Sequence, residues 1–157
     1  MTAVREPALR PEQAARQRAA GLLAKATIAE LKAAWDGLPQ KPAAKPVRGP
    51  ETGLVMVRGR IGGGGAPFNL GEATVTRATV LLPSGTAGHA QALGTSKEKV
   101  RLAAVFDALW QEEATQNWVE AELLAPVEAR LAAEDRQKAE ETAATRVDFF
   151  TMVRGED

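Results

Sequence analysis

The sequence of 157 residues contains no cysteine, no tyrosine and a single histidine. Without cysteine, the chain forms no disulfide framework, no thiolate nucleophile and no cysteine-based zinc site. Twenty basic residues balance twenty acidic residues, so the formal net charge is +0 at pH 7 and the whole chain attracts neither nucleic acid nor anionic lipid. We therefore expect no nucleic-acid partner and no membrane partner.

Long hydrophobic runs are also missing. No stretch approaches the roughly 18 consecutive apolar residues of a transmembrane helix. Residues 1–18 contain arginine but no apolar run and no small-residue cleavage site, so they do not resemble a signal peptide and we expect a cytoplasmic location. What is present is ordinary for a globular protein, with 45% hydrophobic and 25% charged residues.

The beginning of the chain is predicted to be helical. Residues 11–25 are rich in Ala, Gln and Arg and start with a proline, which suits a first helical turn. Thr27 and Glu30 then have the spacing of a capping box, which predicts a second helix at residues 28–37. We expect Gly37 to end this helix in the left-handed conformation.

A proline-rich segment follows at residues 38–50. Its four prolines exclude a helix interior and a central strand, so we predict an extended connector that lets the helices before it pack at a distance or on another chain. The chain then divides into N-terminal helices (residues 1–37), this linker and one α+β domain (residues 51–157), within one structural unit.

Three strands are predicted after the linker, at residues 53–61, 70–82 and 86–93, because Val, Thr and Leu alternate there with other residues. A glycine run at residues 62–65 joins the first two strands. A Pro-Ser-Gly turn joins the second pair, with Gly85 accepting a positive φ. These short connections predict an antiparallel meander.

The second half of the chain is predicted to be largely helical. Thr95 and Glu98 have capping-box spacing and mark the start of a helix that covers one face of the sheet. Its apolar stripe consists of Leu102, Val105, Phe106, Leu109 and Trp110. A further helical segment at residues 118–124 runs into Pro126, and a long helix continues to about Thr145.

The end of this long helix has only alanine as apolar surface, so we expect it to project, supported locally by an ion pair between Glu134 and Lys138. A last strand is predicted at residues 147–154. Phe149 and Phe150 would point to its opposite faces, so both faces must be covered. The predicted fold class is α+β: an antiparallel sheet, made of the three-stranded meander and this C-terminal strand, packed by helices.

Candidates for catalysis are few. His89 has the chemistry of a general base but lies in a predicted strand beside a turn. Ser84 falls in the turn and Ser96 at a helix start, so structural roles explain both serines. The acidic pairs are adjacent on helices, where neighbouring side chains diverge, and do not form a shared-proton dyad. We therefore expect no catalytic residue and no metal site in this chain.

The glycine run could contact an anion. A loop of bare backbone amides can approach a phosphate closely, and Arg58, Arg60 and Arg77 lie on the strands beside it. The loop joins two strands, however, and lacks the lysine of a phosphate-binding loop before a helix. Two readings stay open: a hairpin loop that becomes ordered on a partner, and a small anion-binding α+β module.

Several runs resemble the PhnG family, the G subunit of the bacterial carbon–phosphorus lyase core complex. They are residues 51–55 (ETGLV), 60–63 (RIGG), 71–78 (GEATVTRA), 107–109 (DAL) and, most distinctively, 146–155 (RVDFFTMVRG). The resemblance implies a role in phosphonate catabolism under phosphate starvation. In that family the G, H, I and L subunits together transfer the ribose 5-triphosphate of ATP to methylphosphonate and release adenine.

The resemblance also implies partners. The product, ribose 1-methylphosphonate 5-triphosphate, is broken down by a radical step on the J subunit, and the nucleosidase chemistry is attributed to the I subunit. We therefore expect the I subunit as the nearest partner, with H and J in the core complex and L as a functional partner. This chain is expected to bind no cofactor and to have no activity alone, because ATP is a substrate of the assembled complex. We also expect the isolated chain to associate with itself, as a homodimer, because Phe149 and Phe150 face both ways.

Residues that match the family motif are candidates for contacts. Those for substrate or interface contacts are Arg60, Gly62, Gly63, Arg77 and Arg154, and those for a partner interface are Phe149, Phe150 and Met152. Two hypotheses follow. The chain is either a non-catalytic assembly subunit that holds the I subunit in its active form, or a shared-site subunit whose glycine loop and arginines contact ATP or phosphonate.

Overall fold

The computed structural model describes residues 10–145, so the predicted C-terminal strand, with Phe149, Phe150, Met152 and Arg154, lies outside the described part. The elements are α1 (Pro11–Lys25), α2 (Ile28–Gly37), β1 (Lys45–Arg60), the 3-10 turn η1 (Ile61–Gly63), β2 (Pro67–Leu81), β3 (Ala87–Leu93), α3 (Lys97–Trp110), α4 (Glu113–Val119), the π-helical turn η2 (Glu120–Leu124) and α5 (Ala125–Ala144). This arrangement confirms the α+β class.

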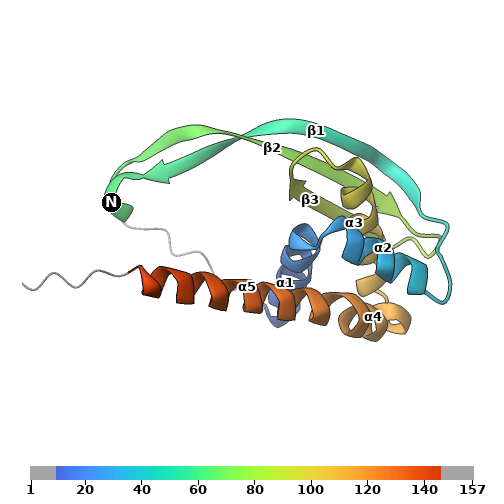
Figure 1. The fold of residues 1–157 in the computed structure, drawn as a ribbon. Coiled ribbons are helices and arrows are strands. Elements are labelled where there is room, and N and C mark those ends of the chain that lie inside the picture. Colours follow the sequence, from blue (N-terminus) through green and yellow to red (C-terminus); the bar gives the residue numbers. More distant parts are fainter. Residues whose placement is uncertain (1–9, 146–157) are drawn as a thin grey trace, which may run out of the picture.

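The sheet has the predicted order β1-β2-β3, and both pairings are antiparallel. Its strands differ greatly in length, because β3 pairs only with the half of β2 from Val75 to Leu81. The other halves of β1 and β2 continue together as a two-stranded ribbon that extends beyond the helices (Figure 1). We call this ribbon, residues 54–74, the arm.

Strand β1 begins at Lys45, eight residues earlier than predicted, and takes over the second half of the proline-rich segment. Pro46 and Pro50 are tolerated because β1 is an edge strand, where a missing N–H breaks no interior ladder. The register also shifts between Pro46 and Arg48 and again between Arg48 and Glu51, as expected where bulges accommodate proline. The extended connector is therefore confined to residues 38–44.

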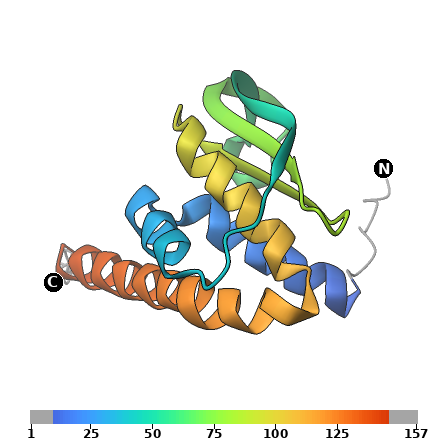
Figure 2. The ribbon, with the colours of Figure 1, turned by 90° about the vertical axis from the view of Figure 1, so that its right-hand side faces the viewer.

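Helix α3 lies between the sheet and the other helices (Figure 2). Every residue of its predicted stripe is buried, and Phe106 is completely inaccessible. The N-terminal helices α1 and α2 pack directly on α3, with Leu23 and Leu31 fully buried in the same core. The prediction that these helices pack at a distance is wrong, since their apolar stripes are covered by α3 within the same chain.

The structure corrects the start of α3 and the way in which α2 ends at Gly37. Helix α3 begins after Ser96, not Thr95, and the Ser96 hydroxyl accepts the backbone N–H of Lys99 at 3.3 Å. Gly37 does not have a positive φ. Helix α2 ends instead because Leu38 is extended, the conformation that a following proline favours.

The second predicted turn and the long helix agree with the structure more closely. Gly85 has φ +91°, as the Pro-Ser-Gly turn requires. The π-helical turn η2 ends at Leu124, two residues before Pro126, and this wider turn accommodates a residue that has no N–H to donate to the carbonyl four positions earlier. The end of α5 is exposed and projects (Figure 1). Glu134, however, pairs with Arg130 at 2.8 Å and not with Lys138.

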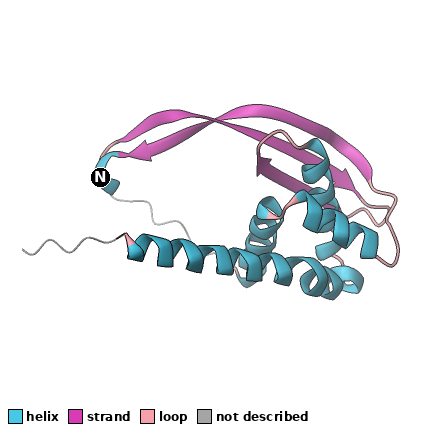
Figure 3. Ribbon diagram, viewed as in Figure 1, coloured by secondary structure: helices cyan, strands magenta, loops and turns pink. Residues whose placement is uncertain are grey.

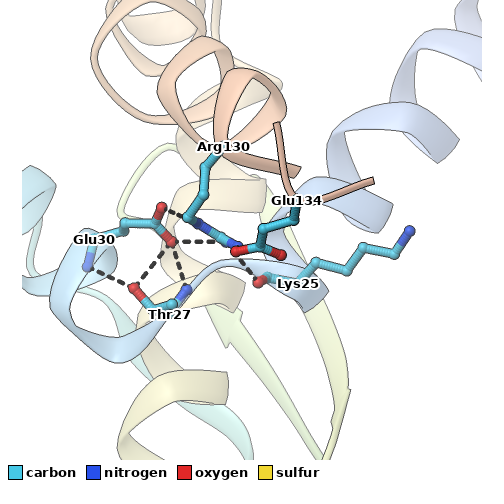
Figure 4. A network of polar contacts seen from close by, with 5 residues as sticks. All are labelled: Lys25, Thr27, Glu30, Arg130 and Glu134. Atoms are coloured by element: carbon cyan, nitrogen blue, oxygen red, sulfur yellow. Dashed lines mark hydrogen bonds and ion pairs between the residues drawn. The ribbon is translucent and has the colours of Figure 1, made fainter. Parts of the chain in front are cut away.

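A polar network fastens α5 to the junction of α1 and α2 (Figure 4). The predicted capping box is present, since Glu30 N–H donates to the Thr27 hydroxyl and Thr27 N–H donates to the Glu30 carboxylate. Arg130 donates to that carboxylate at 2.6 Å and to the Lys25 carbonyl at 3.1 Å. The hydrogen bond from Arg130, ahead of the opposing effect of burial, lowers the pKa of Glu30.

Candidate functional site

The arm exposes apolar side chains on both of its faces. Leu54 and Met56 are 62% and 51% exposed, and Val55 and Val57 are each 38% exposed. Because successive strand residues point to opposite faces, Leu54 and Met56 lie on one face of the ribbon and Val55 and Val57 lie on the other. A two-stranded ribbon is marginally stable alone, and exposed apolar patches mark interaction sites. The arm therefore has the character of a binding element.

The shape of the arm follows from its sequence. Leu70 has no partner across the ribbon, since the register shifts between the pairs Val57–Gly71 and Arg58–Asn69. Such a bulge increases the right-handed twist, which Figure 3 shows as the two strands cross and arch away from the helices. Leu70 is 67% exposed, so the bulge adds a large apolar side chain to the surface.

The tip of the arm is closed by its own contacts. Gly65 N–H donates to the Ile61 carbonyl at 2.9 Å, and Arg60 donates to the Gly65 carbonyl at 3.2 Å. Gly62 has φ +58°, which favours glycine, and Gly63 follows it in the turn η1. Among the sequence candidates, the structure thus brings Arg60, Gly62 and Gly63 together at the tip.

Arg77 lies elsewhere. Its register partner on β1 is Glu51, nine residues before Arg60, which corresponds to about 30 Å along the strand. Arg77 Nε donates to the Glu51 carboxylate at 2.8 Å, and Arg48 Nε lies 3.5 Å from the same oxygen. The glycine loop therefore does not form one cluster with Arg58, Arg60 and Arg77, the three arginines that the sequence placed beside it. Arg58 and Arg60 are near the tip, and Arg77 is at the base of the arm.

His89 is held by structural contacts. Its ring Nδ1 lies 3.1 Å from the Thr79 hydroxyl, and its backbone N–H donates to the buried Asp107 at 2.8 Å. The same carboxylate oxygen of Asp107 accepts from Arg16 at 3.0 Å. This joins β3, α3 and α1 around a carboxylate that the sequence did not single out.

The serines also have structural contacts. The Ser84 hydroxyl donates to the Glu112 carboxylate and lies 3.2 Å from the Thr86 hydroxyl, and Ser96 caps α3. Neither serine contacts His89 within residues 10–145. In the same part of the chain, no three His, Asp or Glu side chains are grouped as metal ligands. Nor does any described helix have the length and apolarity to cross a membrane.

The apolar surface of the arm was missed by the sequence interpretation. The signal was present, because residues 53–57 are apolar at consecutive positions, the same pattern that suggested a doubly covered strand at the C-terminus. The sequence did not reveal that β3 stops short of these residues and leaves them uncovered.

The comparisons with known proteins agree with one another. The family described as "Phosphonate metabolism protein PhnG" matches residues 14–155, which include the arm and every described helix in part or whole. A protein of Rhizobium meliloti (strain 1021), named "Alpha-D-ribose 1-methylphosphonate 5-triphosphate synthase subunit PhnG", is 67% identical over 144 residues, which is 92% of each chain. The chain belongs to the PhnG family of phosphonate metabolism proteins.

Proposed function

We propose that this chain is an assembly subunit of a multi-subunit ribose 1-methylphosphonate 5-triphosphate synthase, in which the arm binds another subunit. The name of the Rhizobium meliloti relative supports the identity of the complex. The observation that carries the role within it is the arm, whose two faces are apolar and uncovered at Leu54, Met56, Val55 and Val57.

The reaction of the assembled complex is a glycosyl transfer. The bond between C1′ of the ribose and the adenine nitrogen breaks, and a bond forms between C1′ and an oxygen of methylphosphonate. Adenine leaves with a proton, and the triphosphate stays on the ribose. ATP is thus a substrate of the complex, and this subunit supplies neither a resident cofactor nor a catalytic residue.

The partner that the arm requires is a protein with an apolar groove that covers both faces of a ribbon. Among the subunits that the family resemblance implies, we assign this role to the I subunit, with H and J in the same core and L acting with them. Binding would stabilise the arm itself, because a lone two-stranded ribbon buries too little surface to be rigid.

The observations favour assembly over an anion-binding module at the glycine run. At the tip, Gly65 N–H already donates within the loop and Arg60 is bound to a loop carbonyl. Arg77 lies too far along β2 to join them. The tip therefore presents fewer free donors than its sequence suggested.

The experiment is co-purification of the tagged chain with the H, I and J subunits. We expect the double variant Leu54→Ser/Met56→Ser to lower recovery of the I subunit by roughly tenfold or more, as two large apolar anchors are lost. The matched control is Val47→Ser/Leu93→Ser, which removes two apolar side chains outside the arm that are more exposed than those of Leu54 and Met56. Full assembly of the arm variant would disprove the role of the arm.

The same preparations test the reaction. Adenine release from ATP and methylphosphonate, with the L subunit added, is expected to require this chain. If the complex forms normally but its activity does not depend on the chain, the assignment to the synthase is wrong even where the arm binds.

A further inference from the structure

We propose that the sheet surface at the base of the arm binds a phosphate or phosphonate group. A hollow of about 380 Å³ lies there, and its polar lining comes from Arg48, Arg77, Thr79, His89 and Gln91. The proposed function is used only to name the molecules that would supply this group, ATP and methylphosphonate. The site itself is inferred from the geometry of this chain.

The strand register places the polar side chains of the hollow opposite one another. Arg48 of β1 is opposite Thr79 of β2, which is opposite His89 of β3, so three polar side chains stand in one row across the sheet. Glu51, Arg77 and Gln91 form the adjacent row. Register partners share a face, and residues two apart in a strand do so as well, so both rows face the same side.

The two arginines share one acidic neighbour. Glu51 accepts from Arg77 Nε at 2.8 Å and lies 3.5 Å from Arg48 Nε, so one carboxylate braces both guanidinium groups. Their terminal nitrogens make no hydrogen bond with residues 10–145. Glu51 is not part of the lining of the hollow, and the lining contains no other carboxylate. Two half-exposed guanidinium groups therefore face the hollow, and no residue from 10 to 145 occupies their terminal donors.

The polar side chains of the hollow match a tetrahedral oxyanion. The planar fork of arginine matches the oxygens of a phosphate group, and two forks can share its negative charge. The contact between the Thr79 hydroxyl and His89 Nδ1 at 3.1 Å holds both side chains at the edge of the hollow. When His89 Nδ1 is the donor in this contact, the Thr79 hydroxyl hydrogen is available to the ligand. Both the triphosphate of ATP and methylphosphonate carry such a group.

The test is calorimetric titration of the full-length chain at low ionic strength. Inorganic triphosphate and methylphosphonate are titrated separately. We expect Arg48→Gln/Arg77→Gln to weaken binding of at least one of them by roughly tenfold or more, since two charge-assisted contacts are lost. Tighter binding of triphosphate would assign the site to the nucleotide, and tighter binding of methylphosphonate to the acceptor.

The matched control is Arg101→Gln/Arg136→Gln, which removes the same charge from two exposed positions outside the hollow and outside the arm. Thr79→Val is a second, milder variant, expected to weaken binding by about threefold with little change of fold. Wild-type chain that binds neither probe at millimolar concentration would overturn the proposal. So would equal losses in the arginine variant and its control, because the effect would then be one of net charge.

These titrations are independent of the complex. If Arg48→Gln/Arg77→Gln loses binding of the probes but still assembles with the other subunits, the phosphate site is supported whether or not the synthase assignment is correct. If the arm variant fails to co-purify with the I subunit but still binds the probes, the result tests the role of the arm and not the phosphate site.

Discussion

At Gly88, strand β3 lies directly against the backbone of helix α3. A Cβ atom built at this position would lie 2.0 Å from the Ala104 carbonyl oxygen and 2.7 Å from the backbone nitrogen of Ala108. Neither backbone atom can move without shifting the helix. We expect Gly88→Ala to lower the free energy of unfolding by about 3 kcal/mol, the upper end of over-packing costs.

Urea unfolding of the full chain, followed by tryptophan fluorescence, measures this change. Gly53→Ala is the matched control, because a Cβ there meets nothing within 4 Å and its φ is not positive. We expect the control to change stability by less than about 1 kcal/mol. Equal midpoints for the two variants would show that α3 and β3 are not in this close contact.

At the scale of elements, the contact of Arg130 with Glu30 makes part of the stability depend on pH. The pKa of Glu30 is lowered in the folded chain, chiefly by its hydrogen bond from Arg130. A carboxyl with a lowered folded pKa contributes stability above its unfolded pKa of about 4.3, and that contribution is lost as pH falls through the folded value.

We therefore expect the wild-type chain to lose more stability than Glu30→Gln when the pH is lowered from about 6 to 3. Urea midpoints at several pH values measure the difference between the two chains, so other carboxyl groups cancel. Glu140→Gln, in the exposed end of α5, is the control and should follow the wild type. Parallel curves for wild type and Glu30→Gln would contradict the linkage.

At the scale of the whole molecule, the exposed arm predicts that the isolated chain associates with itself. Light scattering of the full chain is expected to give a mass above 16.6 kDa that rises with concentration. Leu54→Ser/Met56→Ser should shift the mass towards the monomer, and Val47→Ser/Leu93→Ser should not. A strictly monomeric wild-type chain at high concentration would refute this prediction.

Local sequence patterns determined much of the molecule. The bounds of α1 and α2, the capping box at Thr27 and Glu30, the meander, the turn at Gly85 and the stripe of α3 all follow from spacing, capping and glycine chemistry within a few residues. The run at residues 146–155, together with the other runs that resemble the family, was enough to identify the PhnG family. These features depend on neighbours in the chain, which the sequence lists directly.

Only the tertiary structure decided the rest. The prolines at 46 and 50 could join a strand because β1 is at the edge of the sheet. The arm is exposed because β3 ends at the level of Val75. Arg77 lies beside Glu51, and not beside the glycine loop, because register sets which residues lie opposite one another. Strand lengths and register are settled by pairing between distant segments, and local spacing carries no record of that pairing.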